Sequence, residues 1–589
     1  MSTPSRAEPI LQPADPHGGQ PVRKGLLTIA IEDYFQVGAF SALIPSAHWD
    51  RFDSRLMSST AVVLRLLAET GNHATFFTCG WIADHHPHVL REVVAAGHEI
   101  ACQGYFQHSV LEISPAAFAL DLRRSRQAVE QATGQAVHGH RIGRRWLRPR
   151  DLWVLELIAE AGFAYDSSIC PAGRDYANRR DCETVHQYPL DRGRFHEVPI
   201  SSHRLAGIHV PIAGGNWFRQ APDWPLRRAA DHWLRTRAEP LVAYFHTWEF
   251  DPLQPRIAGT GGLERVRHYR NLAGMSDRLR RWLTDYRFDA IASHLALAPS
   301  AVARAAHDVA TVRDKPALTA VTQPTDAGAG AAAMASAAGI EITLVVPCFN
   351  EEAALPYLAN TLRRFAATSG VGLTLSYVFI DDGSADATWA LLQAQFAGLS
   401  RCALLRHPHN RGIAAAILTG FAACKTDLIA VIDADCTFDP AQLPAMLEYM
   451  AEDVDVVAAS PGHSAGSMRN VPAWRWLLSH GAAALYRGVL HHRLTSYTSC
   501  FRVYRRHAVA GLALSNAGFS GVAEILGRLD LAGRRIVEFP AVLETRVLGQ
   551  SKIRVLATVG DHIVLLARLA ACRWLGRPLP TTVGAMRAD

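Results

Sequence analysis

Three stretches within residues 342–435 decide the fold of this chain: "VVPCFNEE" (345–352), "VFIDDGS" (378–384) and "VIDADC" (431–436). Each is a short apolar run that ends in acidic residues. The runs are bounded and rich in Val and Ile, as buried parallel strands are. Helix-compatible stretches separate them, so the sequence predicts a βαβαβ arrangement. The expected strands are Ile342–Pro347, Tyr377–Ile380 and Leu428–Ile432.

The acidic residues fall where these strands end. Ligands of open α/β sheets bind beyond the carboxyl ends of the strands, so we expect a binding site there. It would include Glu351, Asp381, Asp382, Asp433 and Asp435.

Asp433 and Asp435 flank the small Ala434, and a spacing of two lets both carboxylates project to one side of an extended segment. Two hard oxygen ligands suit Mg²⁺ or Mn²⁺ bridging phosphates, and such a metal stabilises a departing nucleoside diphosphate. The alternative is that "DDGS" is a surface turn and "DAD" an exposed strand end. Three acidic motifs in order, each on a strand end, favour the site.

Composition sets broad limits on the protein. The chain has 589 residues, 49% of them apolar and 19% charged, which predicts two to four soluble globular domains. Its net charge of +6 is too small to indicate nucleic-acid binding. The ten cysteines include no C-x-x-C pair, so we expect neither a zinc site nor a disulfide framework, and a reducing cytoplasm is the default location.

The chain divides into two halves. An Ala-rich stretch at 299–339 lacks large apolar residues, so it predicts a flexible linker. The polar, Pro- and Gly-containing residues 1–24 predict a disordered tail rather than a signal peptide. The domains are expected at 25–298 and 340–575, with a second tail at 576–589.

Two stretches could lie on a membrane without crossing it. Val555–Leu575 is interrupted by charged residues and predicts an amphipathic helix on another surface, protein or bilayer. Trp474–Leu490 could form an interfacial helix that meets a lipid acceptor, although a helix of that make-up is more often core.

The second half also contains basic motifs: "SMRN" (467–470), "YTSCFRVYRR" (497–506) and "RVLGQSKI" (546–553). Arginine forks match phosphate oxygens and lysine supplies a compact charge. The alternative is solvated surface charge, which we favour for Arg505 and Arg506. The candidates for binding phosphate or acceptor are Arg469, Arg502, Arg546, Ser551 and Lys552.

On these motifs, residues 340–575 resemble family 2 glycosyltransferases of the GT-A fold, close to the polyprenyl-phosphate sugar synthases. The resemblance implies that Glu351, Asp381 and Asp382 bind the nucleoside of a nucleotide-diphosphate sugar. It also implies that Asp433 and Asp435 hold Mg²⁺ or Mn²⁺ and that the acceptor is a polyprenyl phosphate. A phosphate acceptor needs no strong base, whereas a sugar hydroxyl would need one.

Two residues leave the acceptor open. The synthases usually place Gln two residues after the second metal Asp, where this chain has Thr437. Glu524, in "GVAEIL", matches an acidic position of the family and is the candidate catalytic carboxylate. The alternative for Glu524 is a helix residue satisfied by a nearby cation.

Residues 25–298 resemble the NodB-homology polysaccharide deacetylases, of the kind found with exosortase and exopolysaccharide systems. The motifs include "IEDYFQV" (31–37), "GHRIG" (139–143), "EVPIS" (197–201) and "YFHTWEF" (244–250). The resemblance implies a distorted (β/α) barrel in which metal-bound water attacks an N-acetyl group. It places the base at Glu32, the metal carboxylate at Asp33, a motif arginine at Arg141 and the general acid at His246.

The two metal histidines of that family are replaced. The positions that match them carry Gln103 and Gln107, and a neutral amide oxygen is a much poorer metal ligand than imidazole. His108 lies one residue beyond the expected ligand, and a shift of one residue turns a side chain in another direction. The cluster "HHPH" (85–88) sits at a predicted helix start. We therefore expect no metal and no hydrolysis in this half.

Together these features predict an α/β protein with a vestigial NodB-type barrel, an Ala-rich linker and a GT-A transferase. The expected function is transfer of a sugar from a nucleotide diphosphate to a polyprenyl phosphate or lipid-linked glycan, in exopolysaccharide or envelope assembly. We expect a cytoplasmic protein, peripheral on the inner face of the plasma membrane. One alternative is a bifunctional enzyme that also de-N-acetylates polysaccharide. Another makes the first half a non-catalytic glycan-binding scaffold.

Overall fold

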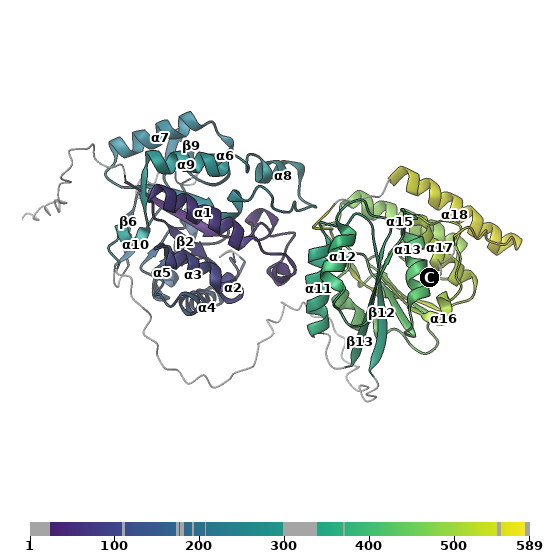
Figure 1. Ribbon diagram of the computed structural model, residues 1–589. Helices are drawn as coiled ribbons and strands as arrows, with labels where there is room; N and C mark the ends of the chain where they lie inside the picture. The colour runs from purple at the N-terminus through teal and green to yellow at the C-terminus, as the bar shows by residue number, and fades with distance from the viewer. Residues whose placement is uncertain are drawn as a thin grey trace, which may run out of the picture. The chain divides into compact units, whose positions relative to one another are not determined.

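The computed structural model contains two compact units (Figure 1). Unit 1 comprises residues 1–39, 54–254 and 262–306, and unit 2 comprises residues 40–53, 255–261 and 307–589. Two short segments from the first half of the sequence therefore belong to unit 2. The residues described are 24–108, 112–171, 176, 182–190, 194–205, 208–297, 339–368, 372–549 and 555–583. The predicted tail at 1–24, except for Lys24 at the start of β1, lies outside these ranges, as do most of the predicted linker, Ser551 and Lys552.

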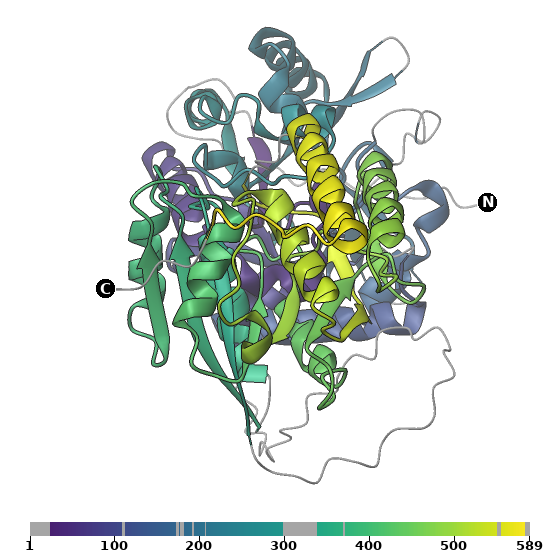
Figure 2. The same ribbon diagram turned by 90° about the vertical axis from the view of Figure 1, so that its right-hand side faces the viewer.

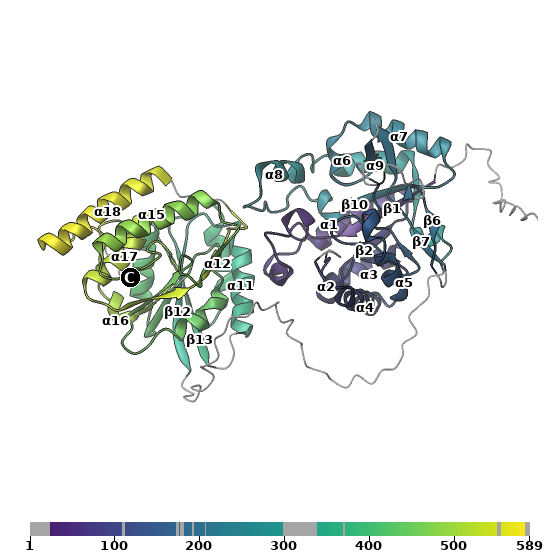
Figure 3. The same ribbon diagram turned by 180° about the vertical axis from the view of Figure 1, so that it is seen from behind.

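Unit 1 is built on a curled, mostly parallel sheet with helices outside it (Figure 3). The strand order is β10-β1-β2-β3-β4-β5-β7-β6, and β11 pairs with β1 as well. Only β6 and β7 pair antiparallel within this sheet, as far as the described residues show. The strands are β1 (Lys24–Ile31), β2 (Thr75–Thr78), β3 (Glu99–Cys102), β4 (Gly139–His140), β5 (Tyr165–Asp166), β6 (His186–Tyr188), β7 (Phe195–Glu197), β10 (Leu241–His246) and β11 (Arg287–Asp289), with a separate hairpin of β8 (Ser202–Leu205) and β9 (Ile208–Pro211).

One buried apolar cluster of unit 1 joins neighbouring strands of this sheet. Leu26, Phe77 and Val242 are buried on neighbouring strands, and Val198 and Ile200 join the same cluster. The helices are α1 (Leu56–Thr70), α2 (Gly80–His85), α3 (Pro87–Ala95), α4 (Pro115–Thr133), α5 (Val154–Glu160), α6 (Gly215–Gln220), α7 (Asp223–Thr236), α8 (Gly262–Tyr269), α9 (Met275–Asp285) and α10 (Ile291–His294).

Unit 2 has a seven-stranded sheet in the order β14-β13-β12-β15-β18-β16-β19. The three predicted strands are confirmed, because β12 pairs in parallel with both β13 and β15. In Figure 1 the sheet separates α11 and α12 from α13 and α17. The strands are β12 (Ile340–Cys348), β13 (Leu373–Asp381), β14 (Cys402–Arg406), β15 (Leu428–Val431), β16 (Val456–Ser460), β18 (Arg502–Arg505) and β19 (Ile536–Pro540), with a second sheet of β17 (Ser467–Arg469) and β20 (Val542–Glu544).

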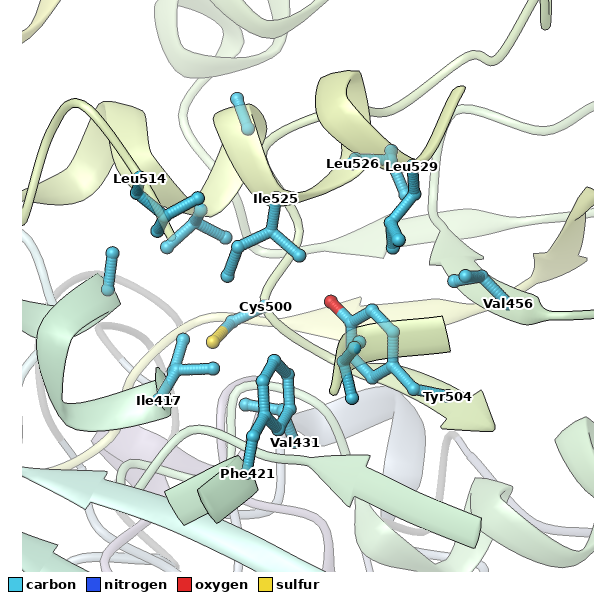
Figure 4. Packing of buried hydrophobic residues seen from close by; sticks show 14 of the residues in the cluster. Ile417, Phe421, Val431, Val456, Cys500, Tyr504, Leu514, Ile525, Leu526 and Leu529 are labelled. Atoms are coloured by element: carbon cyan, nitrogen blue, oxygen red, sulfur yellow. The ribbon is translucent and has the colours of Figure 1, made fainter. Parts of the chain in front are cut away.

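The main core of unit 2 packs α13 and α17 onto the sheet. Figure 4 shows Ile417 and Phe421 of α13 facing Ile525 and Leu529 of α17, with Tyr504 of β18 between them. These runs of buried apolar residues are what fix the sheet and hence the positions of its strand ends. The helices are α11 (Leu355–Thr368), α12 (Thr388–Phe396), α13 (Ile413–Ala423), α14 (Leu443–Leu447), α15 (Ala473–Val489), α16 (Arg506–Val509), α17 (Phe519–Leu531) and α18 (Val555–Leu575).

The two stretches considered as membrane-surface elements are both helical. Helices α15 and α18 pack side by side, and Figure 2 shows α18, in yellow, alongside α15. Within the described residues, no helix combines the length and apolar character needed to cross a membrane.

Candidate functional site

The predicted acidic residues of unit 2 gather at one edge of its sheet. Glu351 follows β12, Asp381 ends β13, and Asp433 follows β15. Because these strands run in parallel and are neighbours, their carboxyl ends meet at the same edge. Ala434 is buried between the two aspartates of "DAD".

Arg546 joins two of these carboxylates. Its Nη2 lies 2.5 Å from Glu351 Oε1, and its Nε lies 2.9 Å from Asp435 Oδ2. The guanidinium is largely buried, so both ion pairs are shielded from solvent. The folded chain thus brings the phosphate-binding candidate to the metal-binding candidate, across more than a hundred residues of sequence.

Negative charge is concentrated at the DAD motif. Burial, together with the charge of Asp435, raises the pKa of Asp433 to about 7, although a hydrogen bond with the Cys500 thiol lowers it. Two close carboxylates repel each other when both are ionised, and a bound cation removes this repulsion. Among the described residues no three His, Cys, Asp or Glu side chains form a ready metal cage. The donor set fits a Mg²⁺ or Mn²⁺ ion held by two carboxylates and completed by ligand and water oxygens.

The two aspartates of "DDGS" differ in their surroundings. Asp381 Oδ1 accepts from the backbone N–H of Ser384, and its Oδ2 lies 3.0 Å from Arg406 Nε. Asp382 accepts hydrogen bonds from His407 Nδ1, Asn410 Nδ2 and the backbone N–H groups of residues 411 and 412. Asp382 therefore anchors the turn that leads into α13.

Two of the predicted site residues, Glu524 and Arg502, form their hydrogen bonds inside the protein. Glu524 is fully buried on α17 and accepts from Ser515 N and Oγ, Asn516 N and Arg528 Nε. Arg502 is also fully buried, and it donates to the carbonyl oxygens of Val522 and Tyr497. This geometry favours structural roles for both, and for Glu524 it matches the alternative of a helix residue satisfied by a nearby cation.

The other basic candidates are not drawn into this cluster by any described contact. The Arg469 side chain is largely exposed, and its nearest carboxylate is Glu544, at 3.8 Å. Ser551 and Lys552 lie outside the described residues.

In unit 1 the predicted base and acid are in contact. Glu32 Oε2 lies 3.0 Å from His246 Nδ1, and Glu32 Oε1 accepts a hydrogen bond from Gln107 Nε2 at 3.2 Å. Burial alone would lower the pKa of His246, but the Glu32 carboxylate outweighs it and raises that pKa. Gln107 adopts a φ of 56°, a left-handed conformation that is uncommon for a residue with a side chain.

Both carboxylate oxygens of Asp33 accept hydrogen bonds from nearby backbone N–H groups. Its Oδ1 accepts from the backbone N–H of Tyr34 and its Oδ2 from that of Arg55, each at 2.9 Å. Burial raises the pKa of Asp33 to about 6, although these hydrogen bonds and one from Ser54 lower it. A carboxyl group that is buried and already hydrogen-bonded is poorly placed to bind a metal.

The remaining residues of the deacetylase motifs form no described ligand set around Asp33. Arg141 is buried, donates to Ser167 O and Oγ, and lies 4.2 Å from the centre of the Phe77 ring. Gln103 is buried, and its backbone N–H bonds Thr78 O. His85 of "HHPH" stacks on Trp81 and donates to its carbonyl. The helix prediction at this cluster holds, because α3 begins at Pro87.

Sequence reasoning missed two partners of the transferase carboxylates. Arg406 forms an ion pair with Asp381, and the Cys500 thiol forms a hydrogen bond with Asp433. Arg406 ends β14 and Cys500 precedes β18, so only strand pairing brings them to the site.

Comparison with known proteins assigns both halves. Residues 343–512 match the model of glycosyl transferase family 2, residues 49–150 match polysaccharide deacetylase, and residues 167–296 match a domain of unknown function, DUF3473. The chain therefore contains a family 2 glycosyltransferase domain and a polysaccharide deacetylase domain, as the sequence motifs predicted.

Individual relatives and a solved structure each match part of the chain. The chain is 27% identical to a dolichol-phosphate mannosyltransferase of Pyrococcus furiosus over 40% of this chain and 65% of that protein. It is 28% identical to an undecaprenyl-phosphate mannosyltransferase of Micrococcus luteus over 40% of this chain and 97% of that protein. A solved Mycobacterium smegmatis structure assigned to the polysaccharide deacetylases is 21% identical, covers 50% of this chain and 99% of its own, and has a TM-score of 0.33.

Proposed function

We propose that unit 2 is a metal-dependent glycosyltransferase that moves a sugar from a nucleotide diphosphate to a polyprenyl phosphate or lipid-linked glycan. The observation that supports this most is the meeting of Asp435, Glu351 and Arg546 at the carboxyl edge of a parallel sheet. Glu351 and Asp435 lie within residues 343–512, the region that matches glycosyl transferase family 2, and Arg546 reaches them from beyond it.

In this proposal each group at the edge has a separate role. Asp433 and Asp435 hold Mg²⁺ or Mn²⁺, which supplies Lewis-acid stabilisation of the departing diphosphate. Arg546 binds the diphosphate through its fork of donors. Asp381 and Glu351 bind the nucleoside, and Asp382 shapes the turn at residues 410–412 beside it.

A phosphate is the acceptor that fits the described residues best. The named relatives act on dolichol phosphate and undecaprenyl phosphate, according to their descriptions. A phosphate is already an anionic nucleophile and requires no strong general base. This agrees with the burial and full hydrogen bonding of Glu524, which leave it poorly placed to accept a proton from a sugar hydroxyl.

Helices α15 and α18 would place this site at a membrane surface. Both helices expose large apolar side chains to solvent. These are Trp474, Trp476, Leu477, Leu478 and Leu485 of α15, and Val559, Ile563, Val564, Trp574 and Leu575 of α18. Arg475, Arg487 and Arg568 are exposed on the same two helices and would face anionic headgroups. We place the protein on the cytoplasmic face of the plasma membrane, where exopolysaccharide machinery would be its partner.

Glycolipid formation tests the proposal. The full chain is offered a panel of nucleotide sugars with polyprenyl phosphate and Mn²⁺, and products are identified by mass spectrometry. Asp435→Ala should reduce transfer roughly 10³-fold, as loss of a group that stabilises transition-state charge does. Asp427→Ala is the control, since Asp427 is exposed at the opposite end of β15. Equal activity of Asp435→Ala and the wild type would remove the metal assignment.

For unit 1 we propose a barrel that has lost hydrolysis and retains a glycan-binding or scaffolding role. The observation that favours this is the contact of Gln107 with Glu32, where the family's metal histidine would stand, together with the full engagement of Asp33. Binding of acetylated oligosaccharide without release of acetate, measured by calorimetry and acetate assay, is the expected result.

A further inference from the structure

Unit 2 includes two segments from the first half of the sequence. We name residues 40–53 the strap and residues 255–261 the short loop. Both pack against the chain around the DAD motif and Arg546.

The strap holds the segment that follows the DAD motif. Arg51 Nη2 lies 2.5 Å from Asp439 Oδ2, and the Arg51 side chain is only 8% exposed. The other oxygen of Asp439 accepts from the backbone N–H of Ala441 and so begins the next helical turn. Asp439 is four residues after Asp435, and between them Cys436 adopts a left-handed φ of 53°. The conformation of this short segment determines where Asp435 points.

The strap is also fixed to α11, the helix that follows Glu351. The rings of Phe52 and Tyr357 lie 4.8 Å apart, edge to face. Asn360 Nδ2 donates to Asp53 Oδ1 and to the Arg51 carbonyl. Strap residues and Asp435 line one small pocket, together with Tyr357, Cys436, Glu544, Thr545 and Val547.

The short loop and the strap together hold the segment around Arg546. Ala258 N–H donates to Val547 O at 2.8 Å. Gly259 has a φ of +82°, and a Cβ placed there would lie 2.6 Å from Thr545 Cγ2. His48 Nδ1 lies 3.8 Å from Glu544 Oε2. Contacts therefore reach the residues directly before and after Arg546.

We propose that the strap and the short loop are positioning elements of the transferase site, and that Arg51 positions Asp435 through Asp439. This rests on the proposed function of unit 2. Without the strap and the short loop, the segments that carry Asp435 and Arg546 would lose these contacts. The strand just before Arg546, β20, is only three residues long and would hold that segment weakly by itself. Positioning groups behind metal ligands typically change metal affinity 10–100-fold when removed.

The test is the metal dependence of transfer by the full chain. Arg51→Met should raise the Mn²⁺ concentration for half-activation about tenfold, with a parallel rise in KM for the nucleotide sugar and a smaller change in kcat. Arg364→Met is the matched control, because Arg364 also pairs with the strap, at Asp50, but on an exposed face of α11. It should change both constants less than twofold.

Two further variants separate positioning from folding. Arg51→Lys keeps the charge and should recover part of the metal affinity. In the Asp439→Asn background, Arg51→Met should add little, since the partner is already removed. If Arg51→Met unfolds the protein, Gly259→Ala provides an independent test, because it should push Thr545 and raise KM while leaving the Arg51 ion pair intact.

The outcomes distinguish this inference from the proposed function. If the wild type forms no glycolipid, the proposed function fails. If the wild type is active and both Arg51→Met and Gly259→Ala keep its Mn²⁺ dependence and KM, the positioning inference is overturned.

Discussion

At the scale of single residues, burial separates the motif positions into two classes. Arg546 and Asp435 pair at the sheet edge where a ligand would bind. Glu524 and Arg502 are fully buried and bond only to their own unit in the contacts described. Sequence motifs identify residue types that matter, but they do not distinguish a group that meets a ligand from one that supports the fold.

Glu524 should therefore affect stability more than catalysis. Glu524→Gln removes the charge facing Arg528 and part of the hydrogen bonding to Ser515 and Asn516. Breaking one side of a buried ion pair should lower the free energy of unfolding by about 3 kcal/mol. Urea unfolding measures this, and transfer per folded molecule should stay within twofold. Glu452→Gln, at an exposed carboxylate, is the control. A large loss of transfer with unchanged stability would restore the catalytic role.

His268 should make the stability of unit 1 dependent on pH. Burial, assisted by Arg219, lowers the pKa of His268 to about 3, and its ring stacks on Trp248 while Nε2 meets Gln254 Oε1 at 2.9 Å. The unfolded chain therefore binds a proton between pH 6.5 and 3 that the folded chain does not. Stability from this group is present above pH 6.5 and is lost as the pH falls.

The measurement compares the wild type with His268→Gln by urea unfolding, followed through tryptophan fluorescence. The difference between their free energies of unfolding should change by about 1.4 kcal/mol per pH unit below pH 6.5. A difference independent of pH would show that His268 titrates normally in the folded protein.

At the scale of elements, α15 and α18 are helices with two apolar faces. Leu565 and Leu569 of α18 are buried in the core, while Ile563, Val564 and Trp574 remain exposed. One face is explained by packing on α17, and Gly527 allows the close approach because a Cβ there would lie 3.0 Å from Leu569. The second face has no partner among the described residues, and the proposed membrane contact would cover it.

Charge placed on this second face should weaken membrane binding. The double variant Leu477→Glu/Ile563→Glu should bind vesicles of anionic phospholipid at least tenfold more weakly than the wild type, because it removes buried apolar area and adds repulsion. Vesicle sedimentation measures the effect. Leu120→Glu changes an equally exposed leucine on α4 of unit 1 and should leave binding unchanged. Equal binding by all three proteins would exclude these helices as the contact.

At the scale of the whole molecule, one chain combines an acidic site in unit 2, where Arg546 pairs with Glu351 and Asp435, and a site in unit 1 where Gln107 and His246 contact Glu32. The purified full chain should form glycolipid with Mn²⁺ and release no acetate from acetylated oligosaccharide. Metal analysis should find no tightly bound Zn, Ni or Co. Stoichiometric metal that is lost in His246→Ala or Asp33→Ala would show instead that unit 1 is a working deacetylase.

Much of this architecture could be predicted from the sequence. The parallel strands β12, β13 and β15 follow from short Val- and Ile-rich runs, since burial on both faces of a sheet requires continuous apolar residues. The acidic edge follows from the rule that parallel strand ends meet. Helix α18 matches its predicted bounds, Val555–Leu575, because its apolar residues recur with a helical period.

The sequence by itself determined the fold class, the two families and the residue types at both sites, because local patterns encode secondary structure and motif spacing. Only the tertiary structure decided which of those residues act together. It brought Arg546 to Asp435, buried Glu524 and Arg502, joined Gln107 to Glu32, and assigned the strap to unit 2. The physical reason is that burial and long-range ion pairing depend on how distant segments pack, and no local pattern in the chain records that.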